Sequence, residues 1–141
     1  MVKKSEVKVT DLIAAPIDEV WKLAADFGGL AEIMPGIESC ETEGEGVGML
    51  RTLPMGGGAV VERLEVLDET THQMGYSIVD SPLPFKDYNA LITLTEQGEG
   101  TAIDWTGTFE PDGVPGEKAE KLARGIYTGG IAGFKGALGL E

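Results

Sequence analysis

The sequence predicts an α+β fold in which a seven-stranded antiparallel sheet packs against one long C-terminal helix. Three observations support this prediction: a strand followed by two short helical segments, a run of strands separated by brief turns, and a final helical pattern. The turns are too short for helical crossovers, so neighbouring strands must run antiparallel. We expect a single domain over residues 1–141, because the chain contains no repeat, linker or low-complexity tract.

The N-terminal part reads as a strand followed by two short helices. Apolar and polar residues alternate from Val7 to Ile13, which is typical of a half-buried strand. Pro16 then begins a helix, because its missing N–H costs nothing in the first turn. Gly28 ends that helix, and a second one is expected over Leu30–Ile33, before a Pro-Gly pair.

The middle of the chain alternates short strand-like segments with clusters of turn-forming residues, as successive hairpins do. The expected strands are Ile37–Thr42, Gly48–Met55, Ala59–Leu67, Gln73–Val79, Tyr88–Thr95 and Thr101–Phe109.

A long helix is expected from Glu117 to about Leu138. Its apolar positions are Ala119, Leu122, Ile126 and Phe134. Glycines lie within or at the end of this pattern at positions 125, 129, 130, 133, 136 and 139. A glycine inside a helix costs about 1 kcal/mol relative to alanine. Two explanations stay open: close approach of the helix to the sheet, and a helix that leaves empty volume beneath it or moves as a lid.

Charge and composition exclude several classes of site. The chain has 11 basic and 24 acidic residues and a formal net charge of −13, which opposes binding to nucleic acids or anionic membranes. A single cysteine, Cys40, excludes an internal disulfide, and a single histidine, His72, excludes any site that needs two imidazoles. We expect Cys40 to be a small buried apolar residue and His72 a solvated loop residue. No metal and no cofactor is expected.

The N-terminus lacks the apolar run of a signal peptide, and no stretch approaches the length of a membrane-spanning helix. We therefore expect a cytoplasmic protein without stable membrane insertion, either a monomer or a homodimer.

One hairpin places two opposite charges on an apolar face. If Gly56-Gly57 are the central turn residues, Arg51 opposes Glu62 and Leu53 opposes Val60. The same face then carries Met49, Arg51, Leu53, Met55, Val60, Glu62, Leu64 and Val66. The other face carries Thr52, Arg63 and Glu65 and is expected to be wet. A buried charge is tolerated only when it is paired. The pair either fixes the strand register or forms a polar site that orients a ligand or moves a proton.

Several segments resemble the SRPBCC superfamily of helix-grip proteins: APIDEVWKLAADFGGL, GVGMLRTLPMGGG, VVERLEVLDE, YSIVDSPLPFKDYNALITL and IDWTGTFEP. This superfamily includes START lipid-binding domains, the birch-pollen allergen group, bacterial polyketide cyclase/dehydrase-like proteins and, more distantly similar to this chain, plant abscisic-acid receptors. The resemblance covers nearly the whole chain and points to the bacterial polyketide cyclase-like branch. It implies a curved seven-stranded sheet that grips the C-terminal helix, with an apolar cavity between them.

By this resemblance, Glu62, Tyr76, Ile78 and Tyr88 match cavity positions of the abscisic-acid receptors, and Trp105 replaces a polar cavity residue. Strand alternation also puts Ile103, Trp105 and Phe109 on one face, and Tyr88, Ala90, Ile92 and Leu94 on one face. The ligand-binding residues expected from both arguments are Glu38, Arg51, Leu53, Val60, Glu62, Leu64, Tyr76, Ile78, Phe85, Tyr88, Ala90, Trp105, Ile126 and Gly130.

The chain departs from the plant receptors at three places. Glu38 stands where they carry the lysine that meets the hormone carboxylate, the Met55–Ala59 turn is shorter than their gate loop, and Leu83–Phe85 replaces their polar latch. A hormone-receptor role is therefore not supported. With two glutamates against one arginine, a neutral hydroxylated or ketonic ligand, aromatic or lipid-like, fits better than a carboxylate.

Two main function classes remain. The favoured one is a protein that binds a small hydrophobic ligand in an internal cavity. The sequence offers only one polar cluster, without a histidine or a metal site, and therefore few groups that could catalyse a reaction. The alternative is a polyketide cyclase/dehydratase-like enzyme in which Glu62, Arg51 and Tyr88 handle protons. A third, weaker possibility is a small subunit or chaperone-like partner of another protein.

Overall fold

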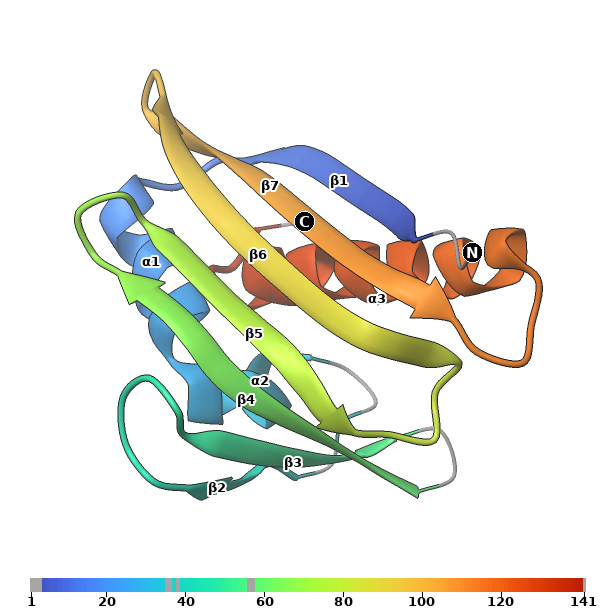
Figure 1. Cartoon of the computed structure of the whole chain (residues 1–141). Helices are drawn as coiled ribbons and strands as arrows, with labels where there is room; N and C mark the ends of the chain where they lie inside the picture. The colour runs from blue at the N-terminus through green and yellow to red at the C-terminus, as the bar shows by residue number, and fades with distance from the viewer. Residues whose placement is uncertain (1–3, 35–36, 38, 56–57, 141) are drawn as a thin grey trace.

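The computed structural model describes the chain except for residues 1–3, 35–36, 38, 56–57 and 141. The described residues form a seven-stranded antiparallel sheet in the order β1-β7-β6-β5-β4-β3-β2. The strands are β1 (Ser5–Ile13), β2 (Glu41–Glu43), β3 (Leu50–Met55), β4 (Gly58–Asp68), β5 (Gln73–Asp80), β6 (Phe85–Gln97) and β7 (Gly100–Pro111). The long helix α3 (Gly116–Ala137) lies along one side of the curved sheet (Figure 1). The predicted helix-grip fold is confirmed.

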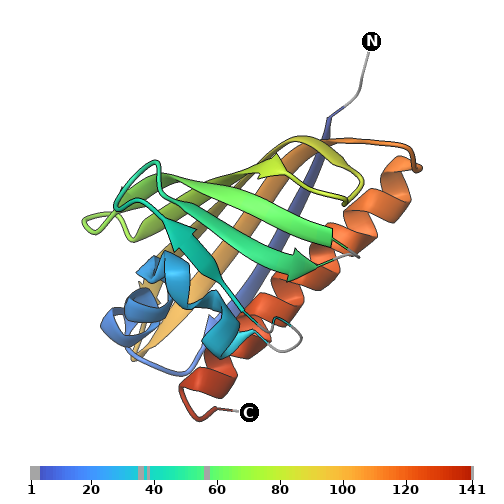
Figure 2. The ribbon, with the colours of Figure 1, turned by 90° about the horizontal axis from the view of Figure 1, so that it is seen from below.

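Two short helices and a 3₁₀ turn connect β1 to the far edge of the sheet. They are α1 (Ile17–Ala25), η1 (Phe27–Gly29) and α2 (Leu30–Ile33). Figure 2 shows them on the same side of the sheet as α3. Both α1 and α3 begin directly after a proline in extended backbone, Pro16 and Pro115, as expected for a residue without a donor.

The predicted register of the β3–β4 hairpin is confirmed. Arg51 pairs with Glu62 and Leu53 pairs with Val60. The prediction that Val66 faces the interior is wrong, because Val66 is 38% exposed. The register of β4 against β5 shifts between Leu64 and Val66, so one extra residue on β4 ends the inward-outward alternation at that point.

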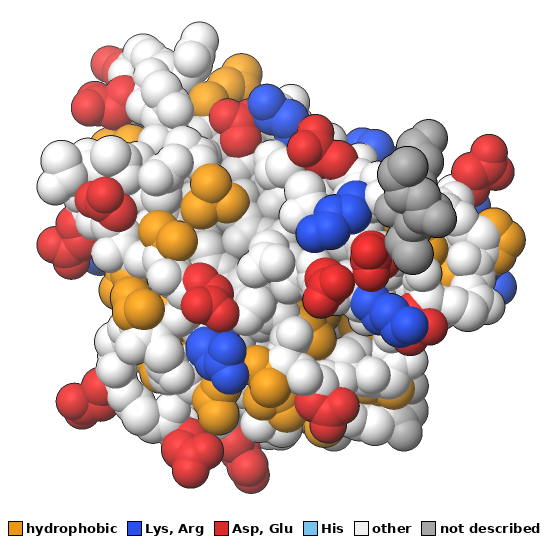
Figure 3. Space-filling model, in the orientation of Figure 1, with side chains coloured by type: hydrophobic (Ala, Val, Ile, Leu, Met, Phe, Trp, Pro, Cys, Tyr) orange, Lys and Arg blue, Asp and Glu red, His pale blue; other side chains and the backbone are white. Residues whose placement is uncertain are grey.

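The opposite face of the sheet is the wet one. Arg63 and Glu65 are exposed there, although Thr52 is half-buried. Figure 3 views this face, on which acidic and basic side chains are interspersed with scattered apolar ones. In the described part of the chain, this face has no helix to pack against, because α1, α2 and α3 all cover the inner face of the sheet.

A second irregularity sets which residues of β6 face the interior. β6 begins at Phe85, three residues before the predicted start, and its register against β7 shifts between Lys86 and Asn89. Asp87 adopts a φ of 49° within this bulge. The extra residue lets both Phe85 and Tyr88 be buried on the inner face, although their sequence numbers differ in parity.

The predicted strand Ile37–Thr42 is reduced to β2 (Glu41–Glu43), an exposed edge strand. Ile37 is buried, but it lies outside any strand.

The inner face of α3 matches the expected one only in part, because Ala119 and Phe134 are buried but the other two expected residues are not. Leu122 is 39% exposed and Ile126 is only partly buried. The buried residues lie at intervals of four up to Tyr127 and are more closely spaced after it: Ala119, Ala123, Tyr127, Gly130, Ile131, Gly133 and Phe134. They pack against inward residues of β6 and β7 that alternation identified correctly, among them Ile92, Ile103 and Trp105.

The glycines of α3 divide into two groups. A Cβ atom at Gly130 would overlap the indole ring of Trp105, and one at Gly133 would overlap the backbone of Ile33. A Cβ at Gly125, Gly129 or Gly136 would meet nothing within 4 Å. Close approach therefore explains Gly130 and Gly133, and packing within the described residues does not require the other three.

Neighbouring glycines provide a matched test of this packing. We expect Gly130→Ala to lower the free energy of unfolding by about 1–3 kcal/mol, because the new methyl group must displace a buried indole. Gly129→Ala adds the same methyl group into open space and should raise it by about 1 kcal/mol. Urea unfolding followed by circular dichroism measures both. Equal effects of the two substitutions would contradict the packing argument.

Candidate functional site

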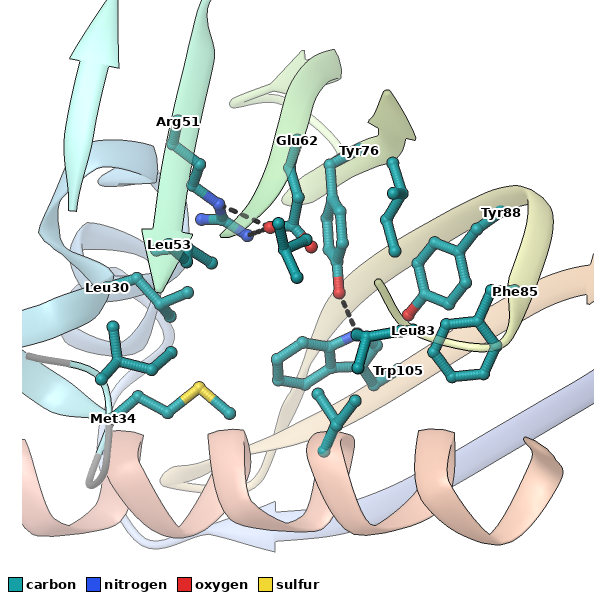
Figure 4. A pocket seen from close by; sticks show the side chains of 14 residues that line it. Leu30, Met34, Arg51, Leu53, Glu62, Tyr76, Leu83, Phe85, Tyr88 and Trp105 are labelled. Carbon is teal, nitrogen blue, oxygen red and sulfur yellow. Dashed lines mark hydrogen bonds and ion pairs between the residues drawn. The ribbon is translucent and has the colours of Figure 1, made fainter. Parts of the chain in front are cut away.

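A cavity lies between the inner face of the sheet, α2 and α3. Its walls are mostly apolar and aromatic, and its volume is about 30 Å³, enough for about two water molecules. Figure 4 shows the lining side chains converging from the sheet above and from the helical segments below. They are Leu30, Met34, Ile37, Arg51, Leu53, Val60, Glu62, Tyr76, Ile78, Leu83, Phe85, Tyr88, Trp105 and Ile126.

An ion pair forms the polar end of this cavity. Arg51 Nε donates to Glu62 Oε1 at 2.7 Å, and Arg51 Nη2 lies 2.6 Å from the same oxygen. Both side chains are almost completely buried, with 4% and 10% of their surfaces exposed. Hairpin pairing puts them directly opposite each other on adjacent strands, so the register of β3 against β4 positions the pair.

Arg51 also ties the helical segment to the sheet. Its Nη1 donates to the backbone carbonyl of Phe27 at 3.0 Å, and its guanidinium carbon lies 3.9 Å from the centre of the Phe27 ring. The Tyr76 ring lies 5.1 Å away from the same carbon. The guanidinium is therefore held by a carboxylate, a carbonyl and two aromatic rings.

The second carboxylate oxygen of Glu62 is left for the cavity. Both contacts from Arg51 are to Oε1, and Oε2 has no hydrogen-bond partner among the described residues. In Figure 4 this oxygen points away from the guanidinium, toward the side of Tyr76. Burial raises the pKa of the Glu62 carboxyl above its usual value of 4.5, and the Arg51 charge offsets only part of that rise.

Three tyrosines meet at the aromatic end of the cavity. Trp105 Nε1 donates to the Tyr76 hydroxyl at 3.3 Å, and the hydroxyls of Tyr88 and Tyr127 are hydrogen-bonded to each other. Burial raises the pKa values of Tyr76 and Tyr88 well above the usual tyrosine value, so their hydroxyls stay protonated at neutral pH.

The structure brings most of the expected site residues together. Those that line the cavity are Arg51, Leu53, Val60, Glu62, Tyr76, Ile78, Phe85, Tyr88, Trp105 and Ile126. Leu64 and Ala90 are buried in the core but do not line the cavity, and Gly130 lies against Trp105. Glu38 lies outside the described residues. Their roles in binding remain a proposal.

Sequence reasoning missed the residues that close the cavity from the helical side. These are Leu30, Met34, Ile37 and Leu83, which come from α2 and from loops without periodicity. It also missed Tyr127, although the spacing of four from Ala119 through Ala123 would have identified it as an inward residue of α3.

His72 and Cys40, for which no functional role was expected, are both less simply placed than the sequence suggested. His72 was expected to be solvated, but it is half-buried in an edge-to-face contact with Trp21, with the two ring centres 5.5 Å apart. Cys40 is half-buried, and burial raises the pKa of its thiol, which disfavours the reactive thiolate.

Neither a metal site nor a membrane span is found in the described part of the chain. No three His, Cys, Asp or Glu side chains there are grouped so as to hold a metal ion. No helix there is both long enough and apolar enough to cross a bilayer.

Removing the guanidinium should make stability more sensitive to pH. We expect Arg51→Met to raise the pKa of Glu62 further and to lower the free energy of unfolding at neutral pH by about 3–5 kcal/mol. Above the unfolded-state value of about 4.5, the folded state then binds more protons than the unfolded state, so stability falls as pH rises toward the folded-state pKa. Urea unfolding at several pH values measures this slope.

Arg63→Met is the control for that experiment, because Arg63 is exposed on the other face of β4, with Glu65 3.8 Å away. It should leave both the stability and its pH dependence close to those of the unsubstituted protein. An unchanged pH slope in Arg51→Met would contradict the raised pKa.

Comparisons with known proteins identify the family. Residues 4–139 match the family described as "Polyketide cyclase / dehydrase and lipid transport". The abscisic acid receptor PYL7 of Arabidopsis thaliana is 31% identical over 87 residues, which cover 58% of this chain and 41% of the receptor. The match thus spans less than half of the receptor's length.

Solved structures with the same fold support this family assignment. The protein XoxI from Bacillus cereus is 30% identical, with a TM-score of 0.86 over 94% of each chain. The structure of Ara h 8.0201 is 18% identical, covers 97% of this chain and 99% of its own, has a TM-score of 0.79, and supports the fold alone. The chain belongs to the polyketide cyclase/dehydrase and lipid transport family of the SRPBCC superfamily.

Proposed function

We propose that this protein binds a small, neutral, largely apolar ligand in the cavity between the sheet and α3. The observation that carries the proposal is a cavity with apolar and aromatic walls and one buried ion pair whose outer oxygen, Glu62 Oε2, has no partner among the described residues. Ligand sites commonly combine such walls with a few placed polar groups that fix orientation.

The charges of the cavity favour a neutral ligand that carries a hydroxyl or keto group. The positive charge of Arg51 is matched by Glu62, so the cavity offers no spare cation for a carboxylate ligand. Glu62 Oε2 accepts a hydrogen bond from a ligand hydroxyl without any new ion having to be desolvated. A carboxylate ligand would instead bring a second negative charge close to the first.

Entry of a ring-sized ligand requires side chains at the cavity to move. The volume of about 30 Å³ is far below the roughly 150 Å³ of an engineered cavity that holds benzene. Leu30, Met34 and Leu83 are the aliphatic side chains that close it from α2 and from the β5–β6 loop. Because an unbranched methionine side chain adapts its packing at low cost, Met34 provides adjustable volume at this wall of the cavity.

The alternative function is a cyclase/dehydratase-like enzyme, and one observation favours it. A buried carboxylate with a raised pKa and an unpartnered oxygen is suited to accept a proton from a substrate. In that case Glu62 is the base, while Arg51 and Tyr88 hold and orient the substrate. Both functions use the same cavity, so the discriminating measurement must separate binding from turnover.

Glu62→Gln separates a binding anchor from a base. If Glu62 anchors the ligand, this substitution should weaken binding of phenol by about tenfold or more, because a hydrogen bond to a charged group contributes about 1.5–3 kcal/mol. Binding of toluene, which lacks the hydroxyl, should change by less than about twofold. Isothermal titration or ligand-observed NMR measures both affinities, and benzoate should bind more weakly than phenol.

Glu65→Gln on the exposed face of the same strand is the control and should change neither affinity. Phenol affinity within about tenfold of the original in Glu62→Gln, with loss of turnover of a ketonic substrate, would favour the enzyme instead. No binding of phenol or toluene to the unsubstituted protein would refute the proposed function. Native mass spectrometry of freshly purified protein is the complementary test for a ligand that co-purifies.

A further inference from the structure

The two tyrosines that line the cavity are each hydrogen-bonded to a buried aromatic side chain. Tyr76 accepts from the indole N–H of Trp105, and Tyr88 is bonded to the hydroxyl of Tyr127. A tyrosine hydroxyl has one proton to donate. Counting protons therefore determines the direction in which the cavity hydroxyls donate.

Tyr127 fixes the direction of the hydrogen bond with Tyr88. The Tyr127 side chain is completely buried, and the Tyr88 oxygen is its hydroxyl's only hydrogen-bond partner among the described residues. An undonated hydroxyl proton in that position would be costly. Tyr127 therefore donates to Tyr88, and the proton of Tyr88 is left for the side on which the Tyr76 hydroxyl and the cavity lie.

Trp105 has the same effect on Tyr76. An indole N–H is only a donor, so the Tyr76 oxygen must accept from it. The proton of Tyr76 is then directed away from Trp105. Figure 4 shows the hydroxyls of Tyr76 and Tyr88 projecting toward the same region beside the indole nitrogen.

Packing holds the side chains of Trp105 and Tyr127 in place. The rings of Trp105 and Tyr127 are stacked with their centres 5.1 Å apart. Gly107 provides the space for the Tyr127 hydroxyl, since a Cβ atom there would overlap it, and Gly130 provides the space for Trp105. Tyr127 lies outside the cavity lining, so it acts through Tyr88 as a positioning residue.

We infer that the cavity presents two convergent phenol O–H donors, from Tyr76 and Tyr88, which select a ligand with a carbonyl oxygen over an isosteric hydrocarbon. This inference rests on the proposed function, because it assigns the ligand class of the same cavity. A ketone oxygen accepts from both hydroxyls, whereas Glu62 lies on the other side of Tyr76, where a ligand hydroxyl would bind. Chains of hydrogen bonds strengthen one another, so donation from Tyr127 makes Tyr88 a better donor.

The test uses acetophenone and α-methylstyrene, which have the same shape and differ in whether an oxygen or a CH₂ group ends the double bond. We expect the protein to bind acetophenone about tenfold more tightly, and the carbonyl stretching frequency of bound acetophenone to fall relative to its value in an apolar solvent. Tyr88→Phe should abolish most of this preference. Tyr127→Phe should reduce both the preference and the frequency shift while α-methylstyrene binding stays the same.

A purely structural role for Tyr127 would change the affinity for both probes equally and leave their ratio and the carbonyl frequency unaltered, which would overturn the inference. Equal affinities for the two probes in the unsubstituted protein would also overturn it while leaving the proposed function intact. If neither probe binds up to its solubility limit, both the inference and the proposed function are refuted for aromatic ligands.

Discussion

The buried pair of Arg51 and Glu62 is the interaction on which the rest of the structure depends. Its two charges lie in an otherwise apolar interior, where each would be very costly without the other. The pair is satisfied only if β3 and β4 keep their register and if the carbonyl of Phe27 stays within reach of the guanidinium. One side chain thereby couples the hairpin to the helical segment that closes the cavity.

The same pair gives the cavity its chemical character. Arg51 uses its donors on Glu62 Oε1 and on the Phe27 carbonyl, so its charge is already matched before any ligand enters. The remaining carboxylate oxygen is an acceptor in a region of low dielectric, where hydrogen bonds are strong and unpaired polar atoms costly. Tyr76 and Tyr88 supply donors a short way along the same cavity. Under the proposed function, an acceptor and two donors between apolar walls suit a neutral, oxygen-bearing ligand.

Two glycines provide the space in which the aromatic side chains beside the cavity pack. Gly107 lets the Tyr127 hydroxyl cross the sheet surface to reach Tyr88, and Gly130 lets α3 approach the indole of Trp105. Without these close contacts, the helix would stand farther from the sheet and Tyr127 would lose its hydrogen-bond partner Tyr88. The cost of glycine in a helix is thus offset by packing at Gly130.

Local pattern by itself determined the order of the elements, the hairpin that pairs Arg51 with Glu62, and the inward residues of β6 and β7, because strand alternation and turn chemistry act between near neighbours. The tertiary structure decided what local pattern does not encode. The bulges at Leu64–Val66 and Lys86–Asn89 interrupt the inward-outward alternation, and their positions depend on how neighbouring strands pair. Leu30, Met34 and Leu83 close the cavity only because distant segments fold over it. Tyr127 meets Tyr88 for the same reason: a hydrogen bond between residues 39 positions apart is set by the packing of α3 against the sheet.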